Sequence, residues 1–175
     1  MSEASFGEPR VAKVATEPGP DLRGALGKRI LVVEDSPSAR RLLQGLLLRL
    51  GVALPDLRLA ANVPEALQLF TRWTPEIAII DLELRPGPPV DLGNQPDGSP
   101  RQYAANGAEL AIQLLQREPE LKVIICSASE PDGTVLGPFL KSGRISSMMK
   151  PILASKVAEA LARATKPPVR AMAGR

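Results

Sequence analysis

Five short apolar runs each give way to a stretch with helical periodicity, and this alternation constrains the fold more than any other feature of the sequence. The apolar runs lie at residues 29–33, 57–60, 76–80, 122–126 and 145–149. The helical stretches follow them at residues 37–50, 62–72, 107–118, 131–142 and 153–164. Strands separated by helices are joined by right-handed crossovers, which make neighbouring strands parallel.

The strand composition predicts which faces of the sheet are covered. Most runs, such as Ile30-Leu31-Val32-Val33, are apolar at consecutive positions rather than at alternate ones. This pattern is typical of strands buried on both faces. The sequence therefore predicts the α/β class, as a flavodoxin-like, doubly wound, five-stranded parallel sheet of order 2-1-3-4-5 with helices on both faces.

Polar residues close four of the five predicted strands. Glu34 and Asp35 follow the first strand, Asp81 the third, Ser127 the fourth and Lys150 the fifth. In an open parallel sheet, ligands bind in the crevice beyond the carboxyl ends of the strands. We expect this topology to bring the three carboxylates, the hydroxyl and the ammonium into one crevice.

Three carboxylates at close range require either a strongly raised pKa or a cation among them. Few protein ligands, all oxygen and supplemented by water, suit Mg²⁺. Beside such an ion the Asp81 carboxylate is a competent nucleophile toward phosphorus. Phosphoryl transfer mainly requires positioning and charge neutralisation. Lys150 can supply a positive charge to a phosphoryl oxygen, and Ser127 a hydrogen bond.

These residues resemble the response-regulator receiver family of two-component signalling. The resemblance spans roughly residues 28–164 and rests on four segments in the expected order and strand positions. They are Ile30-Leu31-Val32-Val33-Glu34-Asp35-Ser36, Ile79-Ile80-Asp81-Leu82, Val123-Ile124-Ile125-Cys126-Ser127-Ala128 and Met149-Lys150-Pro151.

The resemblance implies a role for each matching position around a Mg²⁺ ion. Asp35 and Asp81 would be metal ligands, Glu34 would hold the ion through water, and the backbone carbonyl of Glu83 would complete the protein ligands. The family's fold also implies that this site adjoins the position of phosphorylation.

For the phosphoryl group itself, the resemblance implies Asp81 as acceptor, Lys150 as the phosphate-binding lysine and Ser127 as the hydroxyl switch. It also implies a cis peptide bond before Pro151. A sensor histidine kinase or a phosphotransfer protein would act upstream, and a protein target downstream. Such a chain is a phosphoacceptor module rather than an enzyme.

The sequence departs from the family pattern in two places near the site. The position three residues before Lys150, usually aromatic, is Ser147, which puts the usual hydroxyl–aromatic coupling in doubt. The connection at residues 85–106 is much longer than the family's loop and holds five prolines and the only tyrosine. Long connections of this kind are often functional or disordered. A disordered insertion and a lid or docking element both remain open.

The predicted helix at 131–142 is a poor helix former. Gly133, Gly137 and Pro138 each lower helix stability by about 1 to 3 kcal/mol relative to good formers. A short helix tolerated by packing is one interpretation. A segment poised to rearrange is the other.

Composition excludes several classes of function. The chain has no His and a single cysteine, Cys126, which excludes His-dependent triads, internal disulfides and His- or Cys-based metal sites. Cys126 is expected in the core. The net charge of +3 is spread over scattered basic residues, which argues against a nucleic-acid-binding surface. No apolar run approaches the length of a membrane span, and a cytoplasmic location is expected.

The predicted organisation has three parts: a flexible leader at residues 1–27, a receiver domain at 28–165 with the insertion at 85–106, and a basic tail at 166–175. No output domain is expected in a tail of this length, so the sequence predicts a single-domain regulator. The Leu-rich helix at residues 42–50 is expected to pack into the core and, in addition, offers a contact for a homodimer.

Three other functions compete with this hypothesis. A degenerate receiver acting as a constitutive adaptor is favoured by Ser147 and the long insertion. A dehalogenase-type phosphatase also uses an aspartyl nucleophile, but it requires a second Asp where Glu83 stands and a nucleophile on the first strand. A DNA-binding transcription factor would need a helix-turn-helix segment after residue 165, and none follows.

Overall fold

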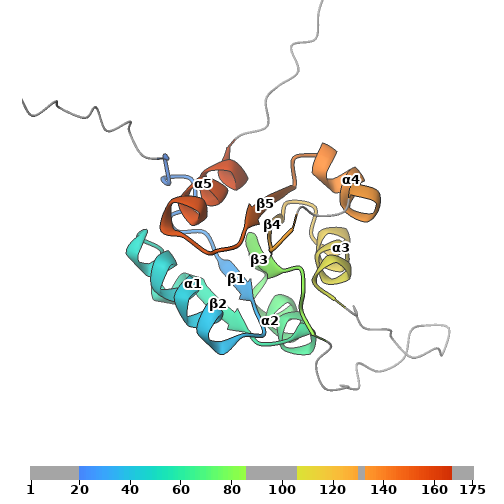
Figure 1. The fold of residues 1–175 in the computed structure, drawn as a ribbon, viewed down its shortest axis with the longest axis horizontal. Coiled ribbons are helices and arrows are strands. Elements are labelled where there is room, and N and C mark those ends of the chain that lie inside the picture. The colour runs from blue at the N-terminus through green and yellow to red at the C-terminus, as the bar shows by residue number, and fades with distance from the viewer. Residues whose placement is uncertain (1–19, 86–105, 130–132, 167–175) are drawn as a thin grey trace, which may run out of the picture.

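The computed structural model describes residues 20–85, 106–129 and 133–166 and confirms the predicted sheet. All strands are parallel and their order is β2-β1-β3-β4-β5 (Figure 1). The strands are β1 (Ile30–Val33), β2 (Leu57–Ala60), β3 (Ile77–Asp81), β4 (Lys122–Ser127) and β5 (Ile145–Met149). Asp81 and Ser127 are thus the last residues of their strands rather than the first residues beyond them.

In the described ranges, five α-helices connect and flank the strands within one or two residues of the predicted bounds. They are α1 (Pro37–Arg49), α2 (Val63–Trp73), α3 (Gly107–Arg117), α4 (Gly133–Lys141) and α5 (Ala154–Thr165), with a 3₁₀ turn, η1 (Leu54–Asp56), before β2. Side-chain caps fix three helix starts, since Ser36, Asn62 and Asn106 each accept a backbone N–H of the first turn. These caps lie directly after β1 and β2 and at the approach to α3.

The helices cover the two faces of the sheet in two groups. Helices α1 and α5 lie on one face, and α2, α3 and α4 on the other (Figure 1). Alternate residues of each central strand feed the two cores: Val32 and Ile79 face α1 and α5, whereas Leu31 and Ile80 face the opposite helices. The central strands are fully buried, which explains their unbroken apolar sequence.

Residues 20–27, which the sequence assigned to the leader, pack against the α1 and α5 face. Ala25 is buried, and its amide donates to the Leu22 carbonyl at 2.8 Å. Leu22 contacts the same apolar core. This packing differs from the expectation that the flexible leader extends to residue 27. Residues 1–19 and 167–175 lie outside the described residues.

Helix α4 forms despite the glycine and proline at positions 137 and 138. Leu136 is buried in the core beneath it, which anchors the helix to the sheet. Its end is held by Ser142, whose hydroxyl donates to the Phe139 carbonyl at 2.7 Å, and by Gly143 with a positive φ of 69°. Whether α4 rearranges in function stays a prediction.

Of the long connection at 85–106, only Arg85 and Asn106 belong to the described residues, so the hypothesis of a lid or docking element falls outside them. Within the described ranges, no helix has both the length and the apolar character needed to cross a bilayer.

Candidate functional site

The carboxyl ends of β1, β3, β4 and β5 bring the predicted site residues together. Backbone hydrogen bonds fix this edge: the Leu82 amide donates to the Cys126 carbonyl at 2.9 Å, and the Lys150 amide to the Ser127 carbonyl at 2.7 Å. The residues that follow the paired strands therefore start from defined positions at one edge, as the topology predicts.

Asp81 and Lys150 form the centre of the site. Lys150 Nζ lies 3.0 Å from Asp81 Oδ2 and 3.7 Å from Glu34 Oε2. The two carboxylates are almost fully buried, and the lysine side chain is about a quarter exposed. Partial burial opposes the charged form of Lys150, but the hydrogen bond and the negative charge of Asp81 outweigh it and raise the pKa of Lys150.

Glu34, Asp35 and Asp81 form an acidic cluster that fits a divalent cation. One carboxylate oxygen from each lies within 4.8 Å of the other two. Burial raises the pKa of Glu34, and the charge of Asp81 adds to that rise. Glu34 Oε1 accepts the Ser36 amide at 3.0 Å, whereas Oε2 is buried with no hydrogen-bond partner among the described residues. A buried oxygen that accepts no hydrogen bond and lies beside two further carboxylates suits a hydrated Mg²⁺ ion.

Two arginines that the sequence analysis did not single out hold the β1–α1 connection. Arg85 Nε donates to Asp35 Oδ2 at 2.7 Å, and this bond together with the positive charge lowers the pKa of Asp35. Arg40, in the first turn of α1, donates from Nη1 to the Glu34 carbonyl at 2.5 Å and to the Asp35 carbonyl at 3.4 Å. Arg40 therefore holds the backbone of both acidic residues.

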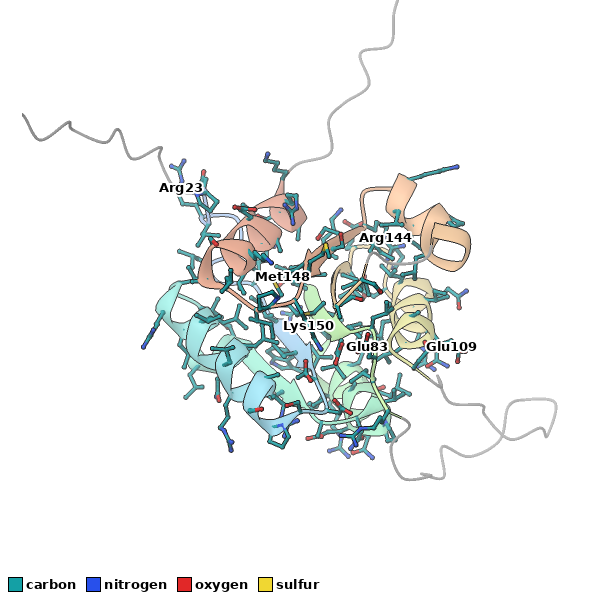
Figure 2. The ribbon with its side chains drawn as sticks, viewed as in Figure 1. Arg23, Glu83, Glu109, Arg144, Met148 and Lys150 are labelled. Carbon is teal, nitrogen blue, oxygen red and sulfur yellow. The ribbon has the colours of Figure 1, made fainter. Side chains whose placement is uncertain are left out.

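Ser127 ends the strand next to β3, and the Glu83 peptide contacts the Asp81 carboxylate. Ser127 is buried, and its Oγ accepts the Ser129 amide at 3.1 Å. The Glu83 amide donates to Asp81 Oδ1 at 3.2 Å, which places this peptide beside the carboxylate while the Glu83 side chain is exposed (Figure 2). The peptide bond between Lys150 and Pro151 is cis, which confirms that expectation.

Gly107 is a further site residue that the sequence analysis treated only as the start of a helix. A Cβ built there would lie 1.9 Å from the Asp81 carbonyl oxygen and 3.0 Å from the Leu82 Cα. Only glycine allows α3 to begin this close to the end of β3. A small residue directly after the Asn106 cap was the available sequence signal.

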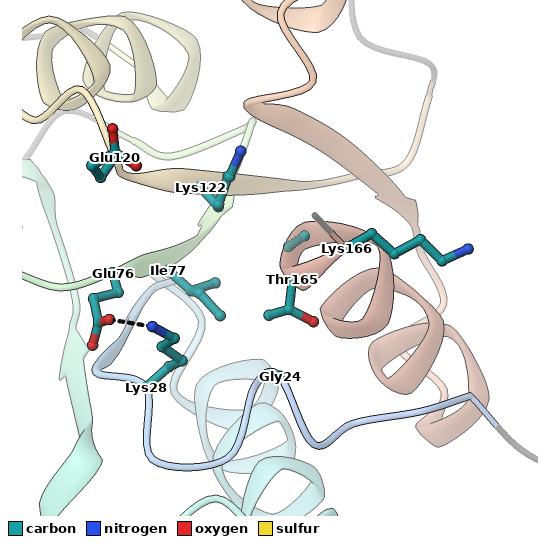
Figure 3. Close-up of a pocket in the computed structure, with 9 residues that line it drawn as sticks. Gly24, Lys28, Glu76, Ile77, Glu120, Lys122, Thr165 and Lys166 are labelled. Atoms are coloured by element: carbon teal, nitrogen blue, oxygen red, sulfur yellow. Dashed lines mark hydrogen bonds and ion pairs between the residues drawn. The ribbon is translucent and has the colours of Figure 1, made fainter. Parts of the chain in front are cut away.

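A separate pocket of about 280 Å³ lies at the opposite end of the strands from the acidic cluster (Figure 3). Positively charged lysines and negatively charged glutamates line it, and Lys28 Nζ pairs with Glu76 Oε1 at 2.7 Å. Gly24 and Thr165 close it where residues 20–27 meet the end of α5. This pocket lies at the amino ends of β3 and β4 and shares no residue with the acidic cluster.

Comparison with known proteins gives relatives of one kind, although no family model matches the chain. The chemotaxis protein CheY of Thermotoga maritima is 26% identical over 141 residues, which are 81% of this chain and 100% of that protein. The positive alginate biosynthesis regulatory protein of Pseudomonas aeruginosa is 30% identical over 141 residues, but the match covers only 47% of that protein and 79% of this chain.

Solved structures of similar fold carry the same description. A receiver domain from Clostridium thermocellum has a TM-score of 0.56 at 20% identity, covering 78% of this chain and 92% of that one. A CheY-like receiver domain from Methanospirillum hungatei has a TM-score of 0.54 at 21% identity, covering 75% of this chain and 88% of that one. At these identities the likeness concerns the fold. Together with the curated relatives and the strand order, it makes the described part of this chain a CheY-like receiver domain of the response-regulator family.

Proposed function

We propose that this receiver domain accepts a phosphoryl group on Asp81 in a Mg²⁺-dependent reaction and thereby switches a protein-binding surface. One observation supports this most strongly: the buried Asp81 carboxylate lies 3.0 Å from the Lys150 ammonium and in one acidic cluster with Asp35 and Glu34, whose Oε2 has no hydrogen-bond partner among the described residues. A buried carboxylate that has both an ammonium group and further metal-binding carboxylates close to it is suited to nucleophilic attack on phosphorus.

The donor would be a phosphohistidine on a histidine kinase or phosphotransfer protein. An oxygen of Asp81 attacks phosphorus, the new O–P bond forms, and the N–P bond breaks. The electron pair of that bond stays on the imidazole, which takes a proton from water. Lys150 leaves its ion pair with the Asp81 oxygen to bind a phosphoryl oxygen, and Ser127 turns its hydroxyl to donate to another.

Asp35, Asp81 and the Glu83 carbonyl would hold Mg²⁺, with Glu34 acting through water. The ion would neutralise the charge that builds on the phosphoryl oxygens. Asp35 is positioned for this by Arg40, which holds its backbone carbonyl. The buried position of Glu34 keeps water from competing for its hydrogen bond to the Ser36 amide.

Intact-mass spectrometry tests the proposal directly. The protein is incubated with Mg²⁺ and phosphoramidate or acetyl phosphate, and we expect one added phosphoryl group that is lost when EDTA replaces Mg²⁺. Asp81→Asn removes the nucleophile and should show no addition. Asp21→Asn, an exposed carboxylate on the N-terminal segment, is the matched control and should be modified like the natural protein.

A second measurement separates metal binding from chemistry. Mg²⁺ should raise the midpoint of thermal unfolding of the natural protein, because binding adds about 2.7 kcal/mol to the free energy of unfolding at a hundredfold excess over the dissociation constant. Asp35→Asn should lose most of this shift. A natural protein that shows neither a thermal shift nor a mass increase with a folded circular-dichroism spectrum would exclude the phosphoacceptor function.

A constitutive adaptor is the second candidate, because Ser147 replaces the usual aromatic and is exposed on β5. Its carbonyl accepts Arg163 Nη2 at 3.0 Å, a contact that does not depend on Ser127. The adaptor would bind its partner equally with and without Mg²⁺ and phosphodonor. For both candidates we propose a cytoplasmic location and a protein target.

A further inference from the structure

We propose that Arg85 competes with a divalent cation for the acidic cluster. Its guanidinium pairs with the Asp35 carboxylate when no cation is bound, and this pairing sets the concentration of divalent cation that is needed to fill the cluster. This inference rests on the proposed Mg²⁺ site and adds a residue that controls it. Arg85 stands four positions after Asp81, at the end of the described part of the β3–α3 connection.

The geometry carries the first step. Arg85 Nε lies 2.7 Å from Asp35 Oδ2, and the hydrogen bond is charge-assisted on both sides. Asp35 is the most accessible member of the acidic cluster, with its side chain 19% exposed, whereas Glu34 and Asp81 are buried. A cation entering from solvent therefore meets Asp35 first, and it meets an oxygen that already has a donor.

The second step concerns the charges within the cluster. Lys150 compensates Asp81 and approaches Glu34, and Arg85 compensates Asp35. Each of the three carboxylates thus has a cation from the chain itself within ion-pair distance. A divalent ion binds less tightly to a cluster whose charge is already partly neutralised. It must displace the hydrogen bond between Arg85 and Asp35, and it must bind near positive charges.

The third step is that Arg85 can leave at small cost. Its side chain is 82% exposed, and its hydrogen bond and ion pair within the described part of the chain are both with Asp35. An ion pair this exposed contributes little to the stability of the fold. The Arg85 side chain can therefore move into solvent when a metal ion binds Asp35 Oδ2.

Mn²⁺ binding followed by electron paramagnetic resonance tests the competition without any phosphodonor, since free Mn²⁺ gives a signal that bound Mn²⁺ loses. Removing the guanidinium should strengthen binding by about threefold to tenfold in Arg85→Ala at low ionic strength. Arg85→Lys keeps the charge without the Nε donor, and its Mn²⁺ affinity should lie between those of the natural protein and Arg85→Ala. Added salt should narrow the difference.

Arg41→Ala is the matched control. Arg41 is an exposed arginine on α1 that forms no hydrogen bond or ion pair with Asp35, so its removal takes away the same charge without freeing the carboxylate. Its Mn²⁺ affinity should stay close to that of the natural protein. Equal affinity of Arg85→Ala and the natural protein, or an equal gain in both alanine variants, would overturn the competition while leaving the metal site intact. Absence of Mn²⁺ binding in every variant would overturn the metal site and the competition together.

Discussion

Lys150 Nζ lies 3.0 Å from Asp81 Oδ2, although 69 residues separate the two along the chain. The pair joins the end of β3 to the end of β5 across β4. It gives a buried carboxylate its only hydrogen-bonded cation among the described residues, so the ion pair links the stability of the fold to the chemistry of the site.

Lys150→Met should destabilise the protein and slow its phosphorylation. Methionine keeps the apolar stem and removes the ammonium, which leaves Asp81 buried without its partner. We expect the free energy of unfolding to fall by about 1 to 3 kcal/mol in urea denaturation at neutral pH. Lys156→Met is the control: its exposed ammonium donates to the Met149 carbonyl, and its loss should cost less than about 0.5 kcal/mol. Equal stability of both variants would contradict the role of the ion pair.

Glu34→Gln should stabilise the metal-free protein at neutral pH, and the gain should depend on pH. Burial raises the pKa of Glu34 in the folded state, so folding favours its protonated form. The free energy of unfolding therefore falls as the pH rises from 4.5, the pKa of Glu34 in the unfolded chain, through its raised pKa in the folded protein. We expect a gain of about 1 kcal/mol at pH 7 that disappears toward pH 4.5.

Urea denaturation of the two proteins across this pH range, in EDTA, measures the difference. With Mg²⁺ added, the sign should reverse, because the natural carboxylate then has a cation to bind. A stability difference that stays constant with pH would rule out the raised pKa as its cause.

Gly107→Ala should be severely destabilising, whereas Gly45→Ala should be mildly stabilising. The new Cβ at position 107 would lie 1.9 Å from the Asp81 carbonyl oxygen, so β3 and α3 must separate. Overpacking of this kind costs about 1 to 3 kcal/mol or more. Gly45 is also helical but has open space around it, and alanine there should add about 0.5 to 1 kcal/mol.

Thermal or urea unfolding of these two variants compares the same substitution in two helices. Because the clash at position 107 falls on the Asp81 backbone, phosphorylation of Gly107→Ala should also be slowed. A neutral effect at position 107 would contradict the close approach of α3 to β3.

Cys126 should be inert to thiol reagents until the protein unfolds. Burial raises the pKa of this thiol to about 11, and only 1% of the residue is exposed. Reaction with 5,5′-dithiobis(2-nitrobenzoic acid) at pH 8 should be negligible in buffer and complete in denaturant. The signal is unambiguous because the chain has one cysteine. Rapid reaction in buffer would mean that β4 opens locally.

The sequence by itself determined the architecture and most of the residues that meet at the candidate site. Consecutive apolar residues such as Val32 and Val33, followed at once by Glu34 and Asp35, mark both a buried parallel strand and the edge where it ends. Strand order and crossover handedness then place Asp81, Ser127 and Lys150 at that same edge. These signals are local, because each depends on a few neighbouring positions and on general rules of sheet topology.

Only the tertiary structure decided how the site is held and compensated. The pairing of Arg85 with Asp35 joins residues 50 positions apart, and the approach of Gly107 to the Asp81 carbonyl depends on where α3 packs. The packing of residues 20–27 against α1 and α5 was missed for the same reason: a short segment without periodicity gives no local signal, and only the apolar surface it meets determines where Ala25 is buried. Contacts between distant segments depend on the assembled shape of the molecule, and no short stretch of sequence contains that shape.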